Sequence, residues 1–423
     1  MRGFRPYIFL IISIALFWFS CKKENDTFPS ISQIKVNQSG SYKFGDTIIV
    51  QVTIKDVDGP VRISILKGAQ SRPLPTELFS KRGDDYSYRI FVNDKYYESN
   101  SYSIRIQAFN GENGRSKFQS IRIEGLEKAI RGICFIGKSG NQSILYKIDS
   151  IGQKSQILLP SESFKKLVSD SRNSQLLTLP QSTGNLKAFN YSNLLQDFSL
   201  NLNPNSLEFE NLYHIDGLNY MILKDGRVFS VDASGNDFLE FSLEDNFLAR
   251  KMAFDDEKML VAAVQAGTTL NELFLLRRSN NSLVQRSFIG YEIVDLCYTE
   301  NDIFYLIYLK NGECIISEYN ANSGLVTEKY QLDAEIPQSL EYGLGMVYIS
   351  TDKNIYTFPA HNFQFPQLIF SFGAEEMKFD ELNNEIYIIS GNNIWKAALA
   401  SSQNQFFASS TEPFTGLDIV YNK

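Results

Sequence analysis

The residue types that most often perform chemistry are few or scattered in this chain. Histidine occurs twice, as His214 in NLYHIDG and His361 in PAHNF. Their separate segments argue against a shared metal site, and no HExxH, Ser-His-Asp, phosphate-loop or GxGxxG arrangement occurs. The 48 acidic residues leave carboxylate pairs possible, because one sequence cannot place two of them at catalytic distance. The sequence therefore names no catalytic residue, no metal ligand and no cofactor.

Two acidic stretches are explained more simply by turns than by sites. Asp56 and Asp58 in KDVDGP could open a calcium loop, but the twelfth position of that loop is Lys67 instead of the required Glu. The second stretch, residues 255–257 (DDE), follows an alternating apolar segment. We expect both stretches to be solvated turns.

Charge and cysteine content exclude further classes. The net charge is −7, and no basic run exceeds two residues, so a nucleic-acid partner is not expected. Beyond residue 21 the cysteines are Cys134, Cys297 and Cys314, widely spaced and without a CxxC pair. We expect small buried side chains in strands. A Cys297–Cys314 disulfide would require their strands to be adjacent.

The N-terminus is predicted to carry a targeting signal. Arg2 and Arg5 precede an apolar core over residues 7–19, and Ser20 stands before Cys21. The core of about 13 residues is short for a hydrocarbon layer of about 30 Å, as in a cleaved signal peptide. A small residue before a cysteine at this point resembles the lipobox of bacterial lipoproteins, although Trp18 and Phe19 are bulkier than usual there.

The resemblance to lipoproteins implies an address in the cell envelope. Residues 1–20 would be the signal peptide, and Cys21 would become the acylated, palmitate-bearing first residue of a membrane-attached chain. The following KKEND is similar to the surface-export tag of Bacteroidota lipoproteins, with an ordinary solvated tether over residues 21–29 as the alternative. We therefore expect an outer-membrane lipoprotein, surface-exposed or periplasmic.

Residues 30–126 predict a small β-sandwich. Short alternating runs such as DTIIVQVTI, YSYRIFV and YSIRIQAF are separated by turn signals such as VDGP and NGENG. Tyr102, Ala108, Asn110 and Gly111 match the last hairpin of PKD-like and other Ig-like modules, so the segment resembles an Ig-like domain. It has no cysteine, so packing alone must hold its core.

Residues 127–423 contain a repeat of about 39–44 residues, each copy consisting of four short strands. Six copies begin near residues 164, 207, 248, 291, 336 and 374. Residues 130–160 provide three strands without an opening one, and FTGLDIVYNK (414–423) is an opening strand with nothing after it. We predict that this last strand pairs beside residues 131–137.

The repeat predicts an all-β chain: an Ig-like sandwich followed by a seven-bladed β-propeller closed by the C-terminal strand. The copies have no WD dipeptide, kelch double glycine or Asp-box. In period and strand pattern they resemble the divergent YncE-like and NHL-like propellers of secreted bacterial proteins.

Short turns favour a binding surface over an enclosed active site. The joins between second and third strands, such as LKDGR and TDKN, are brief and polar, which suits a protein or glycan partner. We predict a non-catalytic binding module; the alternative is a propeller lyase or hydrolase acting on glycans within a carboxylate-lined funnel. The candidate contact face comprises Lys224, Asp225, Arg227, Lys310, Asp352 and Lys353.

Overall fold

The structure is a computed structural model that is entirely of β type in its described part. It describes residues 28–37, 41–67, 70–73, 76–93, 97, 99–111, 113–140, 142–159, 162–201, 208–215, 217–399 and 403–422. The predicted signal peptide, Cys21 and most of the tether lie outside these residues. No helix in the described part is long and apolar enough to cross a membrane. The chain divides into two compact units, with the boundary between Glu127 and Lys128.

The first unit consists of two five-stranded sheets. In one sheet the order is β1-β4-β8-β7, with β2 also paired to β4, and in the other it is β3-β10-β9-β5-β6. The strands are β1 (Ser30–Ile31), β2 (Lys35–Val36), β3 (Ser41–Lys43), β4 (Thr47–Lys55), β5 (Val61–Lys67), β6 (Gln70–Pro73), β7 (Thr76–Arg82), β8 (Asp85–Phe91), β9 (Asn100–Asn110) and β10 (Asn113–Glu124).

Alternating burial joins these two sheets into one core. Ile48, Val50 and other alternate residues of β4 are buried with Ile104 and Ile106 of β9 in a single apolar cluster. The period of two places every second side chain on the same face, which explains the pattern. Asp56 and Asp58 are exposed in the connection between β4 and β5, as expected of a solvated turn, and Asp58 Oδ1 accepts a hydrogen bond of 2.8 Å from Gly111 N.

The second unit is built from four-stranded antiparallel sheets, of which the described residues form seven. Six of them follow the chain order: β14 (Phe164–Asp170), β15 (Gln175–Pro180), β16 (Leu186–Asn190) and β17 (Gln196–Leu200); β18 (Phe209–Ile215), β19 (Leu218–Leu223), β20 (Val228–Val231) and β21 (Asp237–Phe241); β22 (Phe247–Phe254), β23 (Lys258–Gln265), β24 (Asn271–Arg277) and β25 (Leu283–Phe288); β26 (Ile293–Tyr298), β27 (Ile303–Lys310), β28 (Glu313–Asn320) and β29 (Leu325–Leu332); β30 (Pro337–Gly343), β31 (Met346–Thr351), β32 (Ile355–Pro359) and β33 (Gln367–Phe370); β34 (Glu376–Asp380), β35 (Glu385–Ser390), β36 (Asn393–Ala398) and β37 (Gln403–Ser409).

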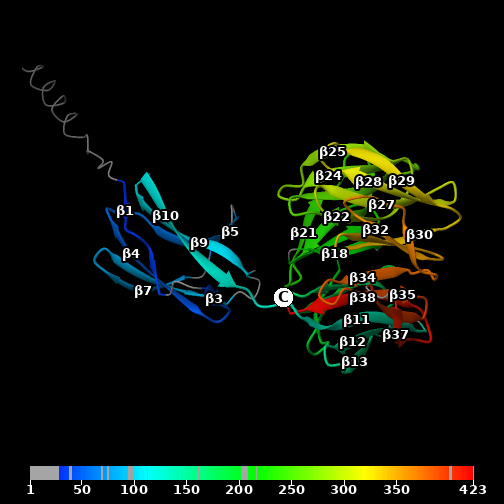
Figure 1. Cartoon of the computed structure of the whole chain (residues 1–423), viewed down its shortest axis with the longest axis horizontal. Coiled ribbons are helices and arrows are strands. Elements are labelled where there is room, and N and C mark those ends of the chain that lie inside the picture. Colours follow the sequence, from blue (N-terminus) through cyan, green and yellow to red (C-terminus); the bar gives the residue numbers. More distant parts are fainter. Residues whose placement is uncertain are drawn as a thin grey trace, which may run out of the picture. The chain divides into compact units, whose positions relative to one another are not determined.

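The remaining sheet joins the two ends of this unit. Its order is β13-β12-β11-β38, made of β13 (Lys154–Leu159), β12 (Gln142–Asp149), β11 (Ile130–Ser139) and β38 (Phe414–Tyr421). β38 pairs antiparallel with β11, with Cys134 opposite Asp418 (Figure 1). The predicted pairing of the C-terminal strand beside residues 131–137 is confirmed.

The sheets form a closed circle. We call β14, β18, β22, β26, β30, β34 and β38 the inner strands. Each contacts the next, and β38 contacts β14. Seven apolar clusters fill the spaces between consecutive sheets, including one shared by the β38 and β14 sheets around Cys134, Leu167 and Val420. This arrangement is propeller-like, and each sheet buries both of its faces against neighbours.

Candidate functional site

One position recurs at the start of every inner strand. In six of the seven, the register shifts by one residue immediately before this position, as at a β-bulge. In the seventh inner strand, β34, two successive residues face one residue of β35. Glu376 is the register partner of Ile389, and Glu375 N also donates a hydrogen bond to Ile389 O. We call the residue after the shift the rim position. The rim residues are Lys166, Asn211, Lys251, Asp295, Ser339, Glu376 and Gly416.

The rim positions surround a polar cavity of about 320 Å³. Six of the seven rim residues line it, together with Lys165, Glu210, Gln338, Glu375, Ile389, Phe414 and Thr415. The seventh is Gly416, where a Cβ atom would stand 2.7 Å from Leu167 N because β38 and β14 approach closely. The cavity is therefore at the end of the circle where the inner strands begin.

The rim charges are divided into two arcs. Lys166, Asn211 and Lys251 occupy three consecutive sheets, and we call them the basic arc. Asp295, Ser339 and Glu376 occupy the next three, and we call them the acidic arc. The cavity thus has ammonium groups on one side and carboxylates on the other.

The acidic arc bonds to the backbone of the circle. Asp295 Oδ2 accepts a hydrogen bond of 2.9 Å from Leu340 N of the next inner strand. Glu376 Oε2 accepts one of 3.2 Å from Leu417 N, which is the equivalent atom one sheet after its own. An inner strand presents unpaired N–H groups along its free edge, and these carboxylates satisfy them.

A second layer lies two residues further along the inner strands. Glu341 Oε1 accepts a hydrogen bond of 3.2 Å from Phe379 N, and Asp418 Oδ2 accepts one of 2.6 Å from Ser169 N. In the same layer Lys378 is held by opposite charges: burial acts against its ammonium, but Glu341 and Asp418 raise its pKa overall. This layer is structural in the same way as the acidic arc.

The basic arc bonds to side chains instead. Lys166 Nζ donates to Asn211 Oδ1 at 2.5 Å and lies 4.6 Å from the ring centre of Tyr213. The ammonium group of Lys251 has no hydrogen bond or ion pair to any described residue. Burial, and then the charge of Lys251, lowers the pKa of Lys166 to about 8. Burial raises the pKa of Glu376, across the cavity, to about 7.

The predicted contact-face residues lie at the same end of the circle. Their side chains form hydrogen bonds and ion pairs with neighbouring residues. The β19–β20 hairpin stands where β18 begins, because Phe209 is the register partner of Leu223. Lys224 forms an ion pair with Glu208, and Arg227 Nε donates to Asp225 Oδ2 at 2.8 Å. The Lys224 carbonyl accepts Arg250 Nη1 at 2.8 Å, which connects this hairpin to the residue beside Lys251.

The other predicted contact residues are similarly engaged. Lys310 Nζ donates to Glu328 Oε1 at 2.7 Å, and Asp352 Oδ1 accepts Ile336 N at 2.7 Å. Lys353 Nζ donates to the Ala334 carbonyl. The structure distributes the six over three hairpins and does not gather them into one cluster.

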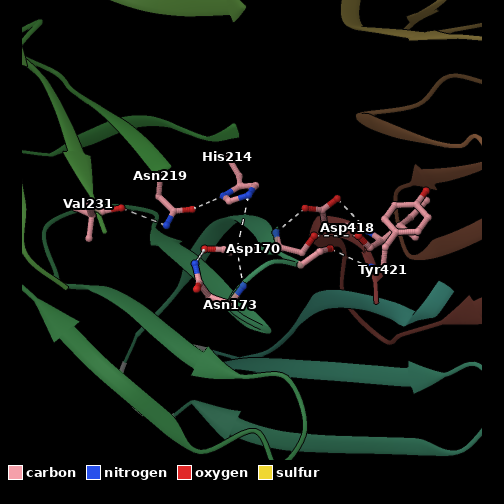
Figure 2. Close-up of polar contacts among 10 residues, drawn as sticks. Asp170, Asn173, His214, Asn219, Val231, Asp418 and Tyr421 are labelled. Carbon is pink, nitrogen blue, oxygen red and sulfur yellow. Dashed lines mark hydrogen bonds and ion pairs between the residues drawn. The ribbon is translucent and has the colours of Figure 1, made fainter. Parts of the chain in front are cut away.

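The two histidines lie apart. Asn219 Nδ2 donates to the Val231 carbonyl, so its Oδ1 faces His214 Nδ1 at 2.9 Å, and His214 Nε2 lies 3.7 Å from Asp170 Oδ1 (Figure 2). His361, by contrast, lies 3.1 Å from exposed Glu300. The described residues contain no group of three His, Cys, Asp or Glu side chains suited to a metal ion.

Cysteines and the acidic stretch have structural places. Cys134 and Cys314 are buried and Cys297 is half-buried, all three as free thiols. β27 separates the strands of Cys297 and Cys314, so the conceivable disulfide is not formed. Asp256 and Glu257 are exposed, as expected of a solvated turn. Asp255 is instead buried, and its Oδ1 accepts a hydrogen bond of 2.6 Å from Glu257 N within the turn.

Sequence reasoning missed the rim residues, although a signal for them exists. Each rim residue is the third of four in a recurring pattern whose first residue is buried and whose fourth is a buried Leu or Met. The seven copies are FKKL (164–167), FENL (209–212), ARKM (249–252), IVDL (293–296), PQSL (337–340), AEEM (374–377) and FTGL (414–417). Aligning the copies on this pattern would have found the rim.

Comparisons with known proteins show that this chain is similar to others in fold. No family model matches the chain, and no curated protein matches it. A functionally unknown protein from Desulfotomaculum acetoxidans is similar in structure, with 12% identity and a TM-score of 0.51, over 69% of this chain and 99% of the other. The Dos1 propeller has 13% identity and a TM-score of 0.46, over 75% and 83%. At this level of identity, similarity extends to the fold alone.

Proposed function

We propose that this chain is a lipid-anchored cell-envelope protein whose propeller binds a protein or glycan partner without catalysis. In this proposal Cys21 carries the lipid and the first unit is an Ig-like spacer. The seven sheets are the blades of a seven-bladed propeller. The lipobox-like residues 18–21 and the alternating strands of residues 30–126 support the address and the spacer.

The observation that carries the binding role is the variation of the rim. At the first and fourth places of the recurring pattern, every copy has a buried residue, as packing between sheets requires. At the rim position the copies have Lys, Asn, Lys, Asp, Ser, Glu and Gly. Close packing explains the Gly, and bonds to backbone N–H groups explain the Asp and the Glu. Neither requires Lys166, Asn211 or Lys251, which line the cavity, as expected of a site that recognises a ligand.

Binding through this face can be tested on the cell envelope. The purified full chain is added to an immobilised envelope fraction, and its retention is compared with that of Lys251→Glu and of Lys154→Glu, an exposed residue of β13. We expect Lys251→Glu to reduce retention at least tenfold and Lys154→Glu to leave it within twofold. Equal retention of wild type and Lys251→Glu would exclude the rim as the binding site.

The address has its own test. Cys21→Ala should move the chain from the membrane fraction to the soluble fraction, whereas Ser20→Ala, which keeps a small residue before the cysteine, should not. Continued sedimentation of Cys21→Ala with membranes would contradict lipid anchoring at this residue.

A second candidate function is a glycan lyase or hydrolase with its site in the cavity. Carboxylates of the acidic arc face it, Tyr213 lies in the layer below, and a pKa of about 7 suits Glu376 to general acid–base work. This function predicts that polysaccharides incubated with the chain release new reducing ends and that Glu376→Gln abolishes the release. We favour binding because the carboxylates already bond to backbone N–H groups.

A further inference from the structure

The basic arc contains hydrogen-bond donors that nothing in the described structure uses. The ammonium group of Lys251 has no bonded partner among the described residues, and Lys166 uses one of its three N–H groups on Asn211. Asn211 Oδ1 accepts from Lys166 and from Leu212 N, which leaves its Nδ2 directed elsewhere. An ammonium group that is partly buried without a partner is costly, so such groups usually meet an anion.

The two lysines act on one cavity. Both line it, and the charge of Lys251 is the main charge that lowers the pKa of Lys166. Neither forms an ion pair with an acidic residue that the structure describes. The lining carboxylates outside the acidic arc are engaged, because Glu210 lies 4.0 Å from Arg250 and Glu375 accepts Gly391 N. Glu376 and Asp295 raise the pKa of Lys166 through their charges, but no described carboxylate is in ion-pair contact with either lysine.

The acidic arc offers the complementary chemistry. Asp295 and Glu376 each use one oxygen on a backbone N–H, and no described donor bonds to Asp295 Oδ1 or Glu376 Oε1. These oxygens accept hydrogen bonds from hydroxyl groups. A ligand that fits both arcs has an oxyanion at one end and several hydroxyls at the other.

We propose that the cavity binds an acidic sugar residue, with its carboxylate on Lys166, Asn211 and Lys251 and its hydroxyls donating to Asp295 and Glu376. This inference rests on the proposed binding role and names its ligand class. An acidic peptide side chain would also satisfy the basic arc, but the backbone beside it offers one N–H donor per residue, whereas a sugar ring carries several hydroxyl donors close to its carboxylate. A cavity of about 320 Å³ lies at the lower end of the size range of small-ligand sites.

The test uses two disaccharides that differ at the predicted contact. Digalacturonate and galactobiose share the same ring and hydroxyls, but the first has a carboxylate where the second has a hydroxymethyl group. We titrate both into the purified full chain by calorimetry. We expect digalacturonate to bind at least tenfold more tightly, because each charge-assisted hydrogen bond is worth roughly one order of magnitude.

Variants assign the preference to the basic arc. Lys251→Met keeps the apolar stem and should reduce the preference to about twofold or less, whereas Lys251→Arg should retain most of it. Lys154→Met is the matched control on the outer strand β13 and should change neither affinity. Melting of each variant shows that it is folded.

The outcomes separate this inference from the proposed function. Equal affinity of the wild type for the two disaccharides, or an unchanged preference in Lys251→Met, would overturn the sugar assignment. If envelope retention is still lost in Lys251→Glu and is removed by protease treatment of the fraction, the binding role holds but the ligand is a protein. Retention that periodate removes, together with a digalacturonate preference, supports both.

Discussion

The two arcs of the rim occupy equivalent positions of one repeated strand, yet they do different work. In the acidic arc, Asp295 and Glu376 accept N–H groups from the following inner strand. In the basic arc, Lys166 bonds to a neighbouring side chain and the ammonium group of Lys251 to no described residue. An inner strand has a free edge with both donors and acceptors, and a carboxylate can cover only the donors.

This difference shows which charges the fold itself explains. The same rule extends to the layer below, where Glu341 and Asp418 accept N–H groups one sheet further on. Carboxylates in the centre of the circle therefore have a structural reason to be present. In the basic arc, Lys166 contacts Asn211 and Tyr213, but no described residue bonds to the ammonium group of Lys251, which is therefore available to a ligand.

The strongest test of the circle is removal of the strand that closes it. Deleting residues 414–423 exposes the edge of β11, removes Asp418 from Ser169 N and opens two apolar clusters, one containing Leu417 and the other Val420. We expect loss of cooperative melting of this unit and aggregation, measured by calorimetry and light scattering. A truncated chain that still melts cooperatively at the wild-type temperature would contradict closure by β38.

Removing a single carboxylate of the second layer should also lower the free energy of unfolding strongly. Asp418→Ala leaves the buried Ser169 N–H without its acceptor and removes an anion beside Lys378. We expect a loss of about 2–4 kcal/mol in the free energy of unfolding, measured in urea. Asp418→Asn keeps an accepting oxygen and should lose less.

The matched control is Asp237→Ala, at an exposed residue of β21, which should stay within about 0.5 kcal/mol of wild type. If Asp418→Ala is no worse than this control, the carboxylate-to-backbone bonds do not hold the circle together.

The architecture could be predicted from the sequence because its signals are local and repeated. A four-strand unit of constant period is visible in one chain, and the unpaired opening strand at 414–423 requires a partner. Chain closure then follows, even though Cys134 and Asp418 are far apart in sequence. Asp58 could likewise be interpreted as part of a turn from its VDGP context.

The rim could not be predicted by alternation, because the register shift interrupts it. In FKKL the two central residues are both polar, and a strict period of two does not say whether Lys165 or Lys166 faces the cavity. The shift before Lys166 decides it. Closure of the circle decides which rim residues face one another across the cavity. No local sequence pattern gives this information. The hairpin tips could be recognised in the sequence as turns, and for that reason the contact face was predicted there.

The acidic arc should produce a pH dependence of moderate size in the free energy of unfolding. The pKa of Glu376 rises to about 7 because of burial, partly offset by Lys378 and Lys166, with Asp418 nearby. The folded chain then holds a proton that the unfolded chain releases near pH 4.5, so stability falls as the pH rises from about 4.5 to 7. Glu376→Gln should remove this fall, by about 1–2 kcal/mol after allowance for the neighbouring charges.

The measurement is urea unfolding of wild type and Glu376→Gln at pH 5 and pH 7.5. Glu244→Gln, in an exposed loop, should follow the wild type at both values. A stability difference between wild type and Glu376→Gln that is the same at both pH values would mean that this carboxyl ionises as freely in the fold as outside it.

The smallest expected effect is the one that most sharply separates the arcs. Lys251→Met removes no bond to a described residue, and it removes the charge that lowers the pKa of Lys166. A lysine whose pKa is lowered in the fold costs stability as the pH falls from about 10.5 to about 8, so relief of that cost should be complete at pH 7 and vanish near pH 10.5. We expect a gain of less than about 1 kcal/mol at pH 7 in urea unfolding. A loss comparable to that of Asp418→Ala would instead make Lys251 a structural residue, and the two arcs would then play the same part.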